Sequence, residues 1–388
     1  MPGPVFARRL QALDKETSFE ILARARALEA KGHDIIHLEI GEPDFETPRH
    51  IKAAAKEAIE RGFTHYGPSP GLPEAREAIA QHVSRDRGVG VERDQVVITP
   101  GGKSVIFFSM LALVEPGDEV IYPNPGFPNY EMTIELLGGK PVPIRIEEER
   151  GFTFDLEQFG KLVTPRTRLC ILNSPHNPTG GVLPSDLLEG VAELAERHDF
   201  MVLSDEIYSK ITYDGEHTSF YSIPGVAERT ILVDGHSKTY AMTGWRLGYG
   251  VMPRDVAVQV ARIAGNSTSC TCTFTQLAGI EALRGPQDAV TKMVAEFRER
   301  RDLVVDGLAR VPGFRCHKPA GAFYVFPNIE GTGRTSKELA ALLMEEAGVA
   351  VLAGGTFGSF GEGYIRISYA NCREALTRAI ERMTAALS

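Results

Sequence analysis

The sequence predicts a doubly wound α/β domain, built on a mostly parallel sheet, with a smaller α+β domain beside it. Short apolar runs without polar alternation recur between residues 96 and 251, which is typical of strands that helices cover on both faces. Helical patterns separate these runs, and this alternation predicts the doubly wound arrangement. Beyond residue 285 the pattern changes to a long charged helix and short strand-like segments. A chain of 388 residues is therefore expected to form two domains.

The elements before the second domain are expected in the following order. Residues 35–40 are apolar enough for a strand, and Thr47 and Pro48 supply an N-cap and a first-turn proline for a helix ending near Gly62. Ser185, after Pro184, is likewise expected to cap a helix. The expected helices lie at about 48–62, 72–87, 102–114 and 185–198. The further strands are expected at 96–98, 119–122, 169–172, 201–203, 231–233 and 247–251.

The second domain is expected to begin after Gly285-Pro286. Its expected elements are a helix at about 287–310, a hairpin-like pair around 314–326, a helix at 336–347, strands near 349–352 and 363–368, and a closing helix. The first 40 or so residues are expected to pack against this domain, because one helix and one strand cannot form a core alone. The predicted boundaries are therefore 46–284 for the large domain, and 1–45 with 285–388 for the small one.

Composition and charge argue against several classes of protein. The 42 basic and 51 acidic residues give a net charge of −9, the wrong sign for nucleic-acid binding. The five cysteines lack the paired spacing of a zinc site, and Cys270 and Cys272 have no good third ligand nearby, so no metal is expected. No apolar run reaches membrane length and the start lacks a signal-peptide core, so we expect a cytoplasmic protein without a membrane partner.

Polar residues follow directly after four of the predicted strands. In open parallel sheets, ligands bind outside the carboxyl ends of the strands, so these loops are the candidate site. They comprise residues 99–104, 173–180, 204–208 and 234–240. One cofactor that all four loops contact is the simplest explanation.

Two features of these loops suit a phosphate group. Gly101 and Gly102 form a turn that enters a helix, where backbone N–H groups and the positive helix end favour an anion. A nucleotide-binding P-loop is excluded because Val97 stands where that motif needs glycine. Arg246 could complete the site with a bidentate fork. Without that role, the glycines are a tight turn and Arg246 is an ordinary surface arginine.

Three further residues have both a chemical and a plain structural interpretation. Asp205 is the first acid after an apolar strand, where an ionised carboxylate needs a partner such as a pyridinium nitrogen or a helix N-terminus. Lys238 follows a buried strand, where limited solvation could lower its pKa and make the amine nucleophilic. Asn177 precedes a proline and could simply form a turn.

The combined loops resemble a known family. The segment from Gly235 to Gly248, GHSKTYAMTGWRLG, is similar to the cofactor-lysine motif of class I/II aminotransferases, which are pyridoxal-phosphate enzymes of fold type I. The resemblance covers essentially the whole chain and is closest to the aspartate aminotransferase-like subgroup. It implies the fold described above, with a large cofactor-binding domain and a small α+β domain.

The resemblance also implies roles for individual residues. Lys238 would carry pyridoxal 5′-phosphate, Asp205 would pair with its ring nitrogen, and Tyr208 would act beside them as a catalytic residue. The implied cofactor contacts are Gly101, Gly102, Lys103, Phe127, Asn177, Asp205, Tyr208, Ser237, Lys238 and Arg246, and the implied substrate contacts are Gly41, Lys103, Phe127, Asn177 and Arg366. Of these, Tyr208 and Asn177 would bind the ring's phenolic oxygen, and Phe127 would stack on the ring.

Two positions depart from the family pattern. Gly235 stands where the family has a phosphate-binding serine, so the phosphate would depend more on Arg246 and Ser237. His236 stands where the family has an apolar or aromatic residue, and we expect the backbone to satisfy its ring.

The segment 64–71 matches the family's loop that reaches a neighbouring subunit, which predicts a homodimer in which Tyr66 contacts the partner's cofactor phosphate.

The predicted reaction is transamination between an L-amino acid, aspartate or a similar donor, and a 2-oxo acid such as 2-oxoglutarate. Lys103 resembles a lysine that binds the distal carboxylate of dicarboxylates, but it could instead lie over the cofactor phosphate and leave room for aromatic or neutral donors. A β-eliminating lyase or a ring-closing synthase on the same scaffold is the alternative enzyme. A ligand-sensing regulator is the alternative outside enzymes, and the net charge of −9 argues against it.

Overall fold

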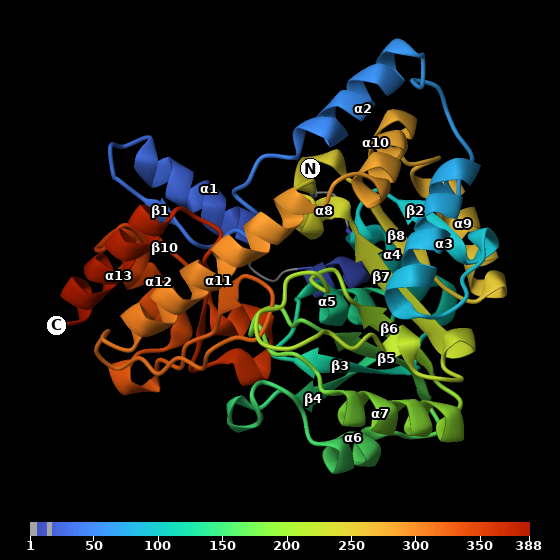
Figure 1. Ribbon diagram of the computed structural model, residues 1–388. Helices are drawn as coiled ribbons and strands as arrows, with labels where there is room; N and C mark the ends of the chain where they lie inside the picture. Colours follow the sequence, from blue (N-terminus) through green and yellow to red (C-terminus); the bar gives the residue numbers. More distant parts are fainter. Residues whose placement is uncertain (1–5, 14–17) are drawn as a thin grey trace, which may run out of the picture.

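The computed structural model describes residues 6–13 and 18–388, so parts of the predicted small domain, residues 1–5 and 14–17, lie outside the described residues. Figure 1 shows a large sheet with helices on both sides, and a smaller body in which α1 lies beside the C-terminal helices. The two bodies meet where Arg366 bonds Asn177 and where the hydroxyls of Tyr208 and Tyr324 lie together. The predicted division at residues 46 and 284 stays a prediction.

The large sheet has seven strands in the order β2-β8-β7-β6-β5-β3-β4. Within it, β8 runs antiparallel to β2 and β7, and the other neighbours are parallel. This confirms a doubly wound, mostly parallel α/β fold. The strands are β2 (Val96–Thr99), β3 (Glu119–Asn124), β4 (Lys140–Arg145), β5 (Thr167–Asn173), β6 (Met201–Asp205), β7 (Thr230–Gly235) and β8 (Gly248–Val251).

Helices cover both faces of this sheet, as the continuous apolar strands require. Alternate strand residues point to opposite faces: Val97 packs in a core with α4, α5 and α9, whereas Val96 and Ile98 pack with α2, α3 and α10. α6 and α7 extend that second layer over β3, β5 and β6. The helices are α2 (Arg49–Glu60), α3 (Pro73–Arg87), α4 (Gly102–Leu113), α5 (Asn129–Leu136), α6 (Leu156–Leu162), α7 (Ser185–His198), α8 (His236–Thr239), α9 (Arg254–Ser267) and α10 (Thr273–Arg284).

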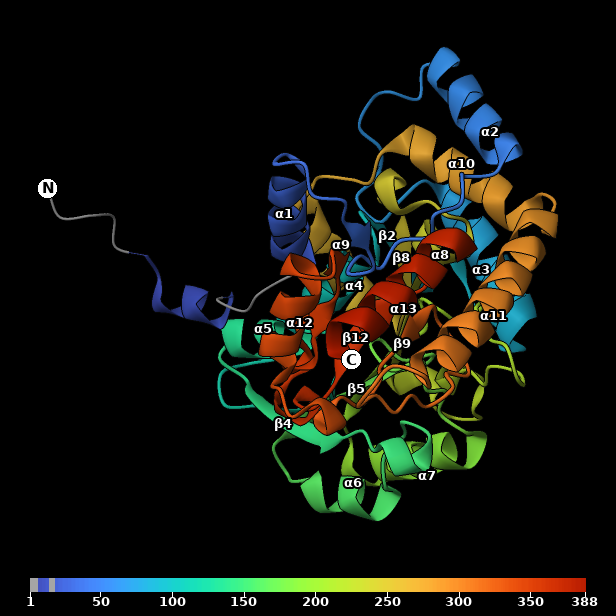
Figure 2. The same ribbon diagram turned by 90° about the vertical axis from the view of Figure 1, so that its left-hand side faces the viewer.

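The apolar core of the smaller body lies among three helices and short strands, and Tyr208, Ile211 and Tyr213, from the segment after β6, also belong to it. The helix α11 packs beside α13 in both views (Figure 1, Figure 2). β1 pairs in parallel with β10, where Ile36 faces Val349, so the N-terminal strand completes a sheet begun at the other end of the chain. The elements are α1 (Ser18–Glu29), β1 (Ile36–His37), α11 (Asp288–Leu308), β9 (Tyr324–Val325), α12 (Ser336–Glu345), β10 (Val349–Ala350), β11 (Leu352–Ala353), β12 (Ile365–Ser368) and α13 (Arg373–Leu387).

Several local expectations are wrong. Neither Thr47 nor Ser185 caps a helix: Pro48 and Pro184 hold the cap positions, and the Thr47 hydroxyl instead donates to the carbonyl of Ala241 at 2.6 Å. The hairpin expected at 314–326 is reduced to one bridge between Arg315 and Asn328, because β9 pairs with β12 instead.

Among the helices of the described residues, none is both long and apolar enough to cross a membrane.

Candidate active site

The polar loops meet at the carboxyl end of the large sheet. Asn173 ends β5 and pairs in register with Asp205, the last residue of β6. The Asn173 side-chain amide also donates to the Asp205 carbonyl at 2.9 Å, which fixes the two strand ends together. Lys238 follows β7, the next strand, on the short helix α8. Side chains from separate loops therefore face one volume.

Lys238 is a partly buried amine with few polar neighbours. Its Nζ donates a hydrogen bond to the carbonyl of Gly41 and lies 6.0 Å from the ring centre of Tyr208 and 5.8 Å from that of Phe323. Burial lowers the pKa of Lys238 to about 8, and the nearby positive charge of Arg366 acts in the same direction. A larger fraction of Lys238 is therefore in the free amine form near neutral pH than of an ordinary lysine, and a nucleophile or proton carrier needs that form.

Asp205 is a buried carboxylate without a cationic partner bonded to it among the described residues. Tyr130 donates its hydroxyl proton to Asp205 Oδ2 at 2.7 Å, and the Ile207 N–H donates to Oδ1 at 3.3 Å. Burial raises the pKa of Asp205 to about 6, although the Tyr130 hydrogen bond opposes this. A cationic ring nitrogen at this carboxylate would favour its ionised form.

Arg366 on β12 enters the site from the smaller body. Its guanidinium donates from Nη1 to Asn177 Oδ1 at 3.1 Å and from Nη2 to the carbonyl of Glu39 at 2.5 Å. It also lies 4.5 Å from the ring centre of Tyr324. Its Nε is buried and has no hydrogen-bond partner among the described residues. Burial lowers the pKa of Arg366, and the negative charge of Glu39 compensates in part. An incoming carboxylate would satisfy this cation.

Tyr208 and Tyr324 form a hydrogen-bonded pair near Lys238 and Arg366. Their hydroxyl oxygens lie 2.8 Å apart, and both side chains are buried. A Cβ added at Gly41 would come within 2.1 Å of the Tyr324 hydroxyl, so glycine is required here for the two elements to approach. The Tyr208 hydroxyl is thus held by that of Tyr324, and the Tyr208 ring lies near Lys238 Nζ.

A basic corner lies where α4 begins. Gly101 has a φ of +84°, and a Cβ there would come within 2.3 Å of Arg246 Nη2. Gly102 starts the helix, whose first N–H groups have no partners within the helix. Arg246 donates to the carbonyls of Pro100 at 3.2 Å and Thr243 at 2.9 Å, which holds it against this turn. Glycines, helix start and guanidinium together suit a phosphate.

Lys103 lies between this basic corner and an aromatic ring. Its Nζ is 5.1 Å from the ring centre of Phe127, and burial, with the charge of Arg246, lowers its pKa. Phe127 in turn packs edge-on against Tyr130 at 5.6 Å. Tyr130 therefore contacts the Phe127 ring with its own ring and Asp205 with its hydroxyl.

The two departures in the lysine motif have structural explanations. A Cβ at Gly235 would lie 2.9 Å from the Cα of Gly248, so the close approach of β7 and β8 excludes serine there without rearrangement. His236 is buried, and its Nε2 lies 3.2 Å from the carbonyl of Gly279, whereas its Nδ1 is buried without a hydrogen-bond partner among the described residues, so the backbone satisfies only one of the two ring nitrogens. Burial lowers the pKa of His236 to about 4, so the ring is neutral at pH 7. Ser237 beside it is also buried.

Tyr66 lies apart from this set. It is 88% exposed, so its side chain is not part of the core of this chain. A cavity of about 690 Å³ is lined by residues that include Pro100, Trp245, Arg246 and Cys272, and Lys238 is not among its lining residues.

Sequence reasoning missed three contributors. Tyr130 binds Asp205, Tyr324 pairs with Tyr208, and Glu39 receives a hydrogen bond from Arg366. None of them directly follows a strand of the large sheet, which is where candidate residues were sought. The signal available for Tyr130 was its position three residues after Phe127, close to one helical turn.

The charge pattern suits one elongated, charged molecule. A basic corner for an anion stands at one end, a buried acid for a cation at the other, and a lysine with a lowered pKa faces the same space. Among the described residues, no three His, Cys, Asp or Glu side chains are grouped so that they could hold a metal ion. An organic cofactor with a phosphate and a basic ring nitrogen fits these donors.

Comparison with known proteins identifies the family of this chain. Residues 33–383 match the family described as aminotransferase class I and II. An aspartate aminotransferase of Pyrococcus horikoshii is 41% identical over 384 residues, 98% of this chain and 97% of that protein. An aromatic-amino-acid aminotransferase 2 of Thermococcus litoralis is 44% identical over 353 residues, 90% of each chain. A solved structure of an aspartate aminotransferase from Thermus thermophilus with maleate has a TM-score of 0.94 at 39% identity, covering 99% of this chain and 100% of that one. The chain therefore belongs to the class I and II aminotransferases and is an aminotransferase.

Proposed function

We propose that this aminotransferase moves the amino group of aspartate, or of a similar L-amino acid, to a 2-oxo acid such as 2-oxoglutarate, with pyridoxal phosphate held by Lys238. The observation that carries the proposal is the meeting of Lys238, Asp205 and the basic corner at Arg246 around one volume. When bound, the cofactor's pyridinium ring would withdraw electrons from the substrate Cα.

The chain's own residues would then divide the work. Lys238 Nζ, whose pKa is about 8, would take the proton from the substrate Cα. Asp205 would hold the ring nitrogen in its protonated form, and Tyr130 would keep that carboxylate oriented. Tyr208 and Asn177 would bind the phenolic oxygen, and Phe127 would pack against the ring face. The phosphate would lie among Gly101, Gly102, Lys103, Ser237 and Arg246.

The substrate α-carboxylate would lie against Arg366, whose buried Nε is unpaired among the described residues. Asn177 Oδ1 accepts a hydrogen bond from Nη1 of this guanidinium at 3.1 Å, and the carbonyl of Gly41 accepts one from Lys238 Nζ. A bidentate pair there would fix the amino acid so that its Cα–H faces Lys238.

The distal group of the substrate would face Lys103. A cation beside Arg246 supports a dicarboxylate, as does the similarity to aspartate aminotransferases of Pyrococcus horikoshii and Thermus thermophilus. The similarity to the aromatic-amino-acid aminotransferase of Thermococcus litoralis supports an aromatic donor as the second candidate, since the rings of Phe127, Tyr324 and Phe357 are close at hand.

The proposed assembly is a homodimer in which Tyr66 reaches the partner's cofactor phosphate. The exposure of Tyr66 supports this, because a side chain that reaches a partner subunit must be free of contacts within its own chain, and Tyr66 is 88% exposed. The five cysteines are all free, and we place the enzyme in the reducing cytoplasm on that ground.

Half-reactions with a panel of donors test the proposal. Aspartate alone should bleach the absorbance of the lysine-linked cofactor, and 2-oxoglutarate should restore it. Tryptophan and alanine in the same assay distinguish aromatic and neutral donors. Release of ammonia and an oxo acid without an acceptor would instead identify a lyase.

A further inference from the structure

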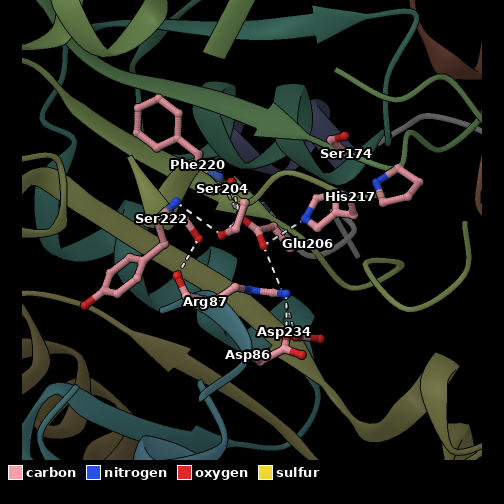
Figure 3. Close-up of polar contacts among 12 residues, drawn as sticks. Asp86, Arg87, Ser174, Ser204, Glu206, His217, Phe220, Ser222 and Asp234 are labelled. Carbon is pink, nitrogen blue, oxygen red and sulfur yellow. Dashed lines mark hydrogen bonds and ion pairs between the residues drawn. The ribbon is translucent and has the colours of Figure 1, made fainter. Parts of the chain in front are cut away.

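A second group of ionisable side chains is buried behind the site, and the roles proposed above do not use it. It lies on the opposite face of the sheet from Tyr130. Asp205 points toward Tyr130 on α5, whereas Glu206, the next residue, points toward the end of α3. Figure 3 shows this group gathered around Glu206 and Arg87.

The Glu206 carboxylate is almost fully enclosed by donors. Oε1 accepts hydrogen bonds from the hydroxyls of Ser204 at 3.0 Å and Ser219 at 2.7 Å, and from the Phe220 N–H at 3.2 Å. Oε2 lies 3.0 Å from both His217 Nε2 and Arg87 Nη2. The side chain is 1% exposed. Although burial opposes ionisation, Arg87 and these hydrogen bonds hold the pKa of Glu206 below its usual value.

The same guanidinium also reaches β7. Arg87 Nη2 lies 3.5 Å from Asp234 Oδ2, which is also 3.3 Å from the Tyr249 hydroxyl. Asp234 Oδ1 accepts from the Gly235 N–H at 2.7 Å. Gly235 is the residue before α8, so this carboxylate is bonded to the backbone that leads directly into the helix carrying Lys238.

Arg87 itself is firmly held. It is the last residue of α3, its side chain is 7% exposed, and its carbonyl accepts from the Ser222 hydroxyl at 2.9 Å. The neighbouring Asp86 forms an ion pair with Lys210, in the loop that also carries Tyr208. The end of α3 is therefore attached to the segments that follow both β6 and β7.

We propose that Arg87 is a positioning residue for transamination: its buried guanidinium joins Glu206 and Asp234, and so fixes the spacing between Asp205 and Lys238. Asp205 immediately precedes Glu206, and Lys238 lies four residues after Asp234. The groups that Asp205 and Lys238 would bind belong to one rigid ring, so a change in the spacing between the two strand ends would misalign one of them. This inference rests on the proposed function.

Charge makes the attachment strong. Glu206 and Asp234 are two buried carboxylates that share one guanidinium, and burial raises the pKa of Asp234 to about 6 even with Arg87 beside it. Removal of the guanidinium would leave both carboxylates poorly compensated, and the strand ends would separate or admit water. A lysine at this position would keep the charge but offer a point contact in place of the planar fork.

The test compares three variants of the full-length enzyme. Arg87→Met removes the charge and keeps most of the side-chain volume, and Arg87→Lys keeps the charge. Arg301→Met is the matched control, because Arg301 is also a buried arginine, at 1% exposure, but its carboxylate partners are Asp302 on α11 and Asp214, neither of which adjoins Asp205 or Lys238 in the chain. Thermal unfolding of each variant gives the loss of stability against which the other measurements are compared.

Two measurements separate positioning from stability. The first is the affinity of the apoenzyme for pyridoxal phosphate, followed by quenching of Trp245, the single tryptophan of the chain. The second is the separation of kcat from KM, measured well below each unfolding temperature. In Arg87→Met we expect weaker cofactor binding and a kcat lower by about tenfold to a hundredfold, with the KM for the amino donor within about threefold. Arg87→Lys should recover part of both losses, and Arg301→Met should change neither.

Wild-type kcat and cofactor affinity in Arg87→Met would overturn the proposal, as would equal kcat losses in Arg301→Met. If Arg87→Met does not fold, Glu206→Gln takes its place, since the amide keeps the shape but loses the ionic contact. It should lower kcat in the same way, and wild-type kcat in this variant would also overturn the proposal. A wild-type enzyme that binds no pyridoxal phosphate would refute the proposed function itself, and this is measured first.

Discussion

Burial determines the charge of Asp205, which would bind the ring nitrogen of the cofactor, and of Lys238, which would carry the cofactor. Asp205 and Lys238 lie in the same low-dielectric site, and in each case burial is the largest cause of the pKa shift. The pKa of the acid rises and that of the amine falls, so each moves toward neutrality in the free protein. Binding of a cationic ring to Asp205 would reverse this for the carboxylate. The electrostatics of the free site are thus unfavourable, and binding of the cofactor would relieve this.

Asp205→Asn should therefore stabilise the apoenzyme at pH 7 while it removes most of the activity. The folded pKa of about 6 exceeds the unfolded value near 4, so the folded state binds more protons between these pH values and its stability falls as pH rises through about 6. At pH 7 the variant should gain about 2–3 kcal/mol in the free energy of unfolding, and at pH 4 almost nothing. Urea unfolding of the apoenzymes at both pH values measures this.

Asp306→Asn is the control for that experiment, because Asp306 on α11 is exposed and should give no pH-dependent gain. Equal stability of wild type and Asp205→Asn at pH 7, or full turnover of the variant, would contradict the role given to Asp205.

Lys103→Ala addresses substrate choice. If its ammonium binds a distal carboxylate, the variant should raise the KM for aspartate about tenfold or more and change the KM for alanine little, since a charged hydrogen bond contributes about 1.5–3 kcal/mol. Steady-state kinetics with both donors at saturating pyridoxal phosphate decides this. Equal increases for both donors would assign Lys103 to the phosphate region alone.

Among the strands of the large sheet, those that helices cover on both faces could be predicted from the sequence, and the exposed edge strand β4 could not. Continuous apolar runs marked β2, β3 and β5 to β8. β4 has the sequence KPVPIR, in which two prolines argue against a strand, yet at the sheet's edge the missing N–H groups are tolerated. The cap predicted at Thr47 failed because its hydroxyl donates to the carbonyl of Ala241 instead, and the cap predicted at Ser185 failed because α7 already begins at that residue.

The candidate site was predictable to the same extent and for a related reason. Residues that follow strands, such as Asp205 and Lys238, converge because parallel strands end at one edge. Tyr130 and Arg87 come from helices on opposite faces, and no rule of spacing relates a helix residue to a strand end across the sheet. Their contributions became visible only through contacts in three dimensions.

The turn before α4 can be tested as an element. Gly101→Ala should lose about 1 kcal/mol or more of stability from its positive φ, and in addition weaken pyridoxal phosphate binding because its Cβ would push against Arg246. Gly225→Ala is the matched variant: its φ of +85° is nearly the same, but a Cβ there meets nothing within 4 Å. Equal cofactor affinities in the two variants would remove this turn from the phosphate site.

At the scale of the whole molecule, the proposed dimer makes each site depend on two chains. A Lys238→Ala subunit keeps Tyr66, and a Tyr66→Asp subunit keeps Lys238. If Tyr66 acts across the interface, a hybrid dimer contains one intact site, and mixing two inactive proteins should restore up to half of the wild-type activity. If Tyr66 acts within its own chain, the hybrid contains no intact site.

Differently tagged subunits allow the hybrid to be purified before assay, with each parent homodimer as the inactive reference. Absence of activity in a confirmed hybrid, or full activity of a monomer at assay concentration, would contradict the shared site.

Borohydride reduction of the enzyme loaded with pyridoxal phosphate, followed by digestion and peptide mass spectrometry, directly identifies the lysine that holds the cofactor. Reduction makes the lysine–cofactor linkage permanent, so the pyridoxyl mass should appear on the peptide that contains Lys238. The same treatment of Lys238→Ala should leave the active site unlabelled. A pyridoxyl group on Lys103, or on any lysine other than Lys238 in the wild-type enzyme at one equivalent per chain, would show that Lys238 does not hold the cofactor.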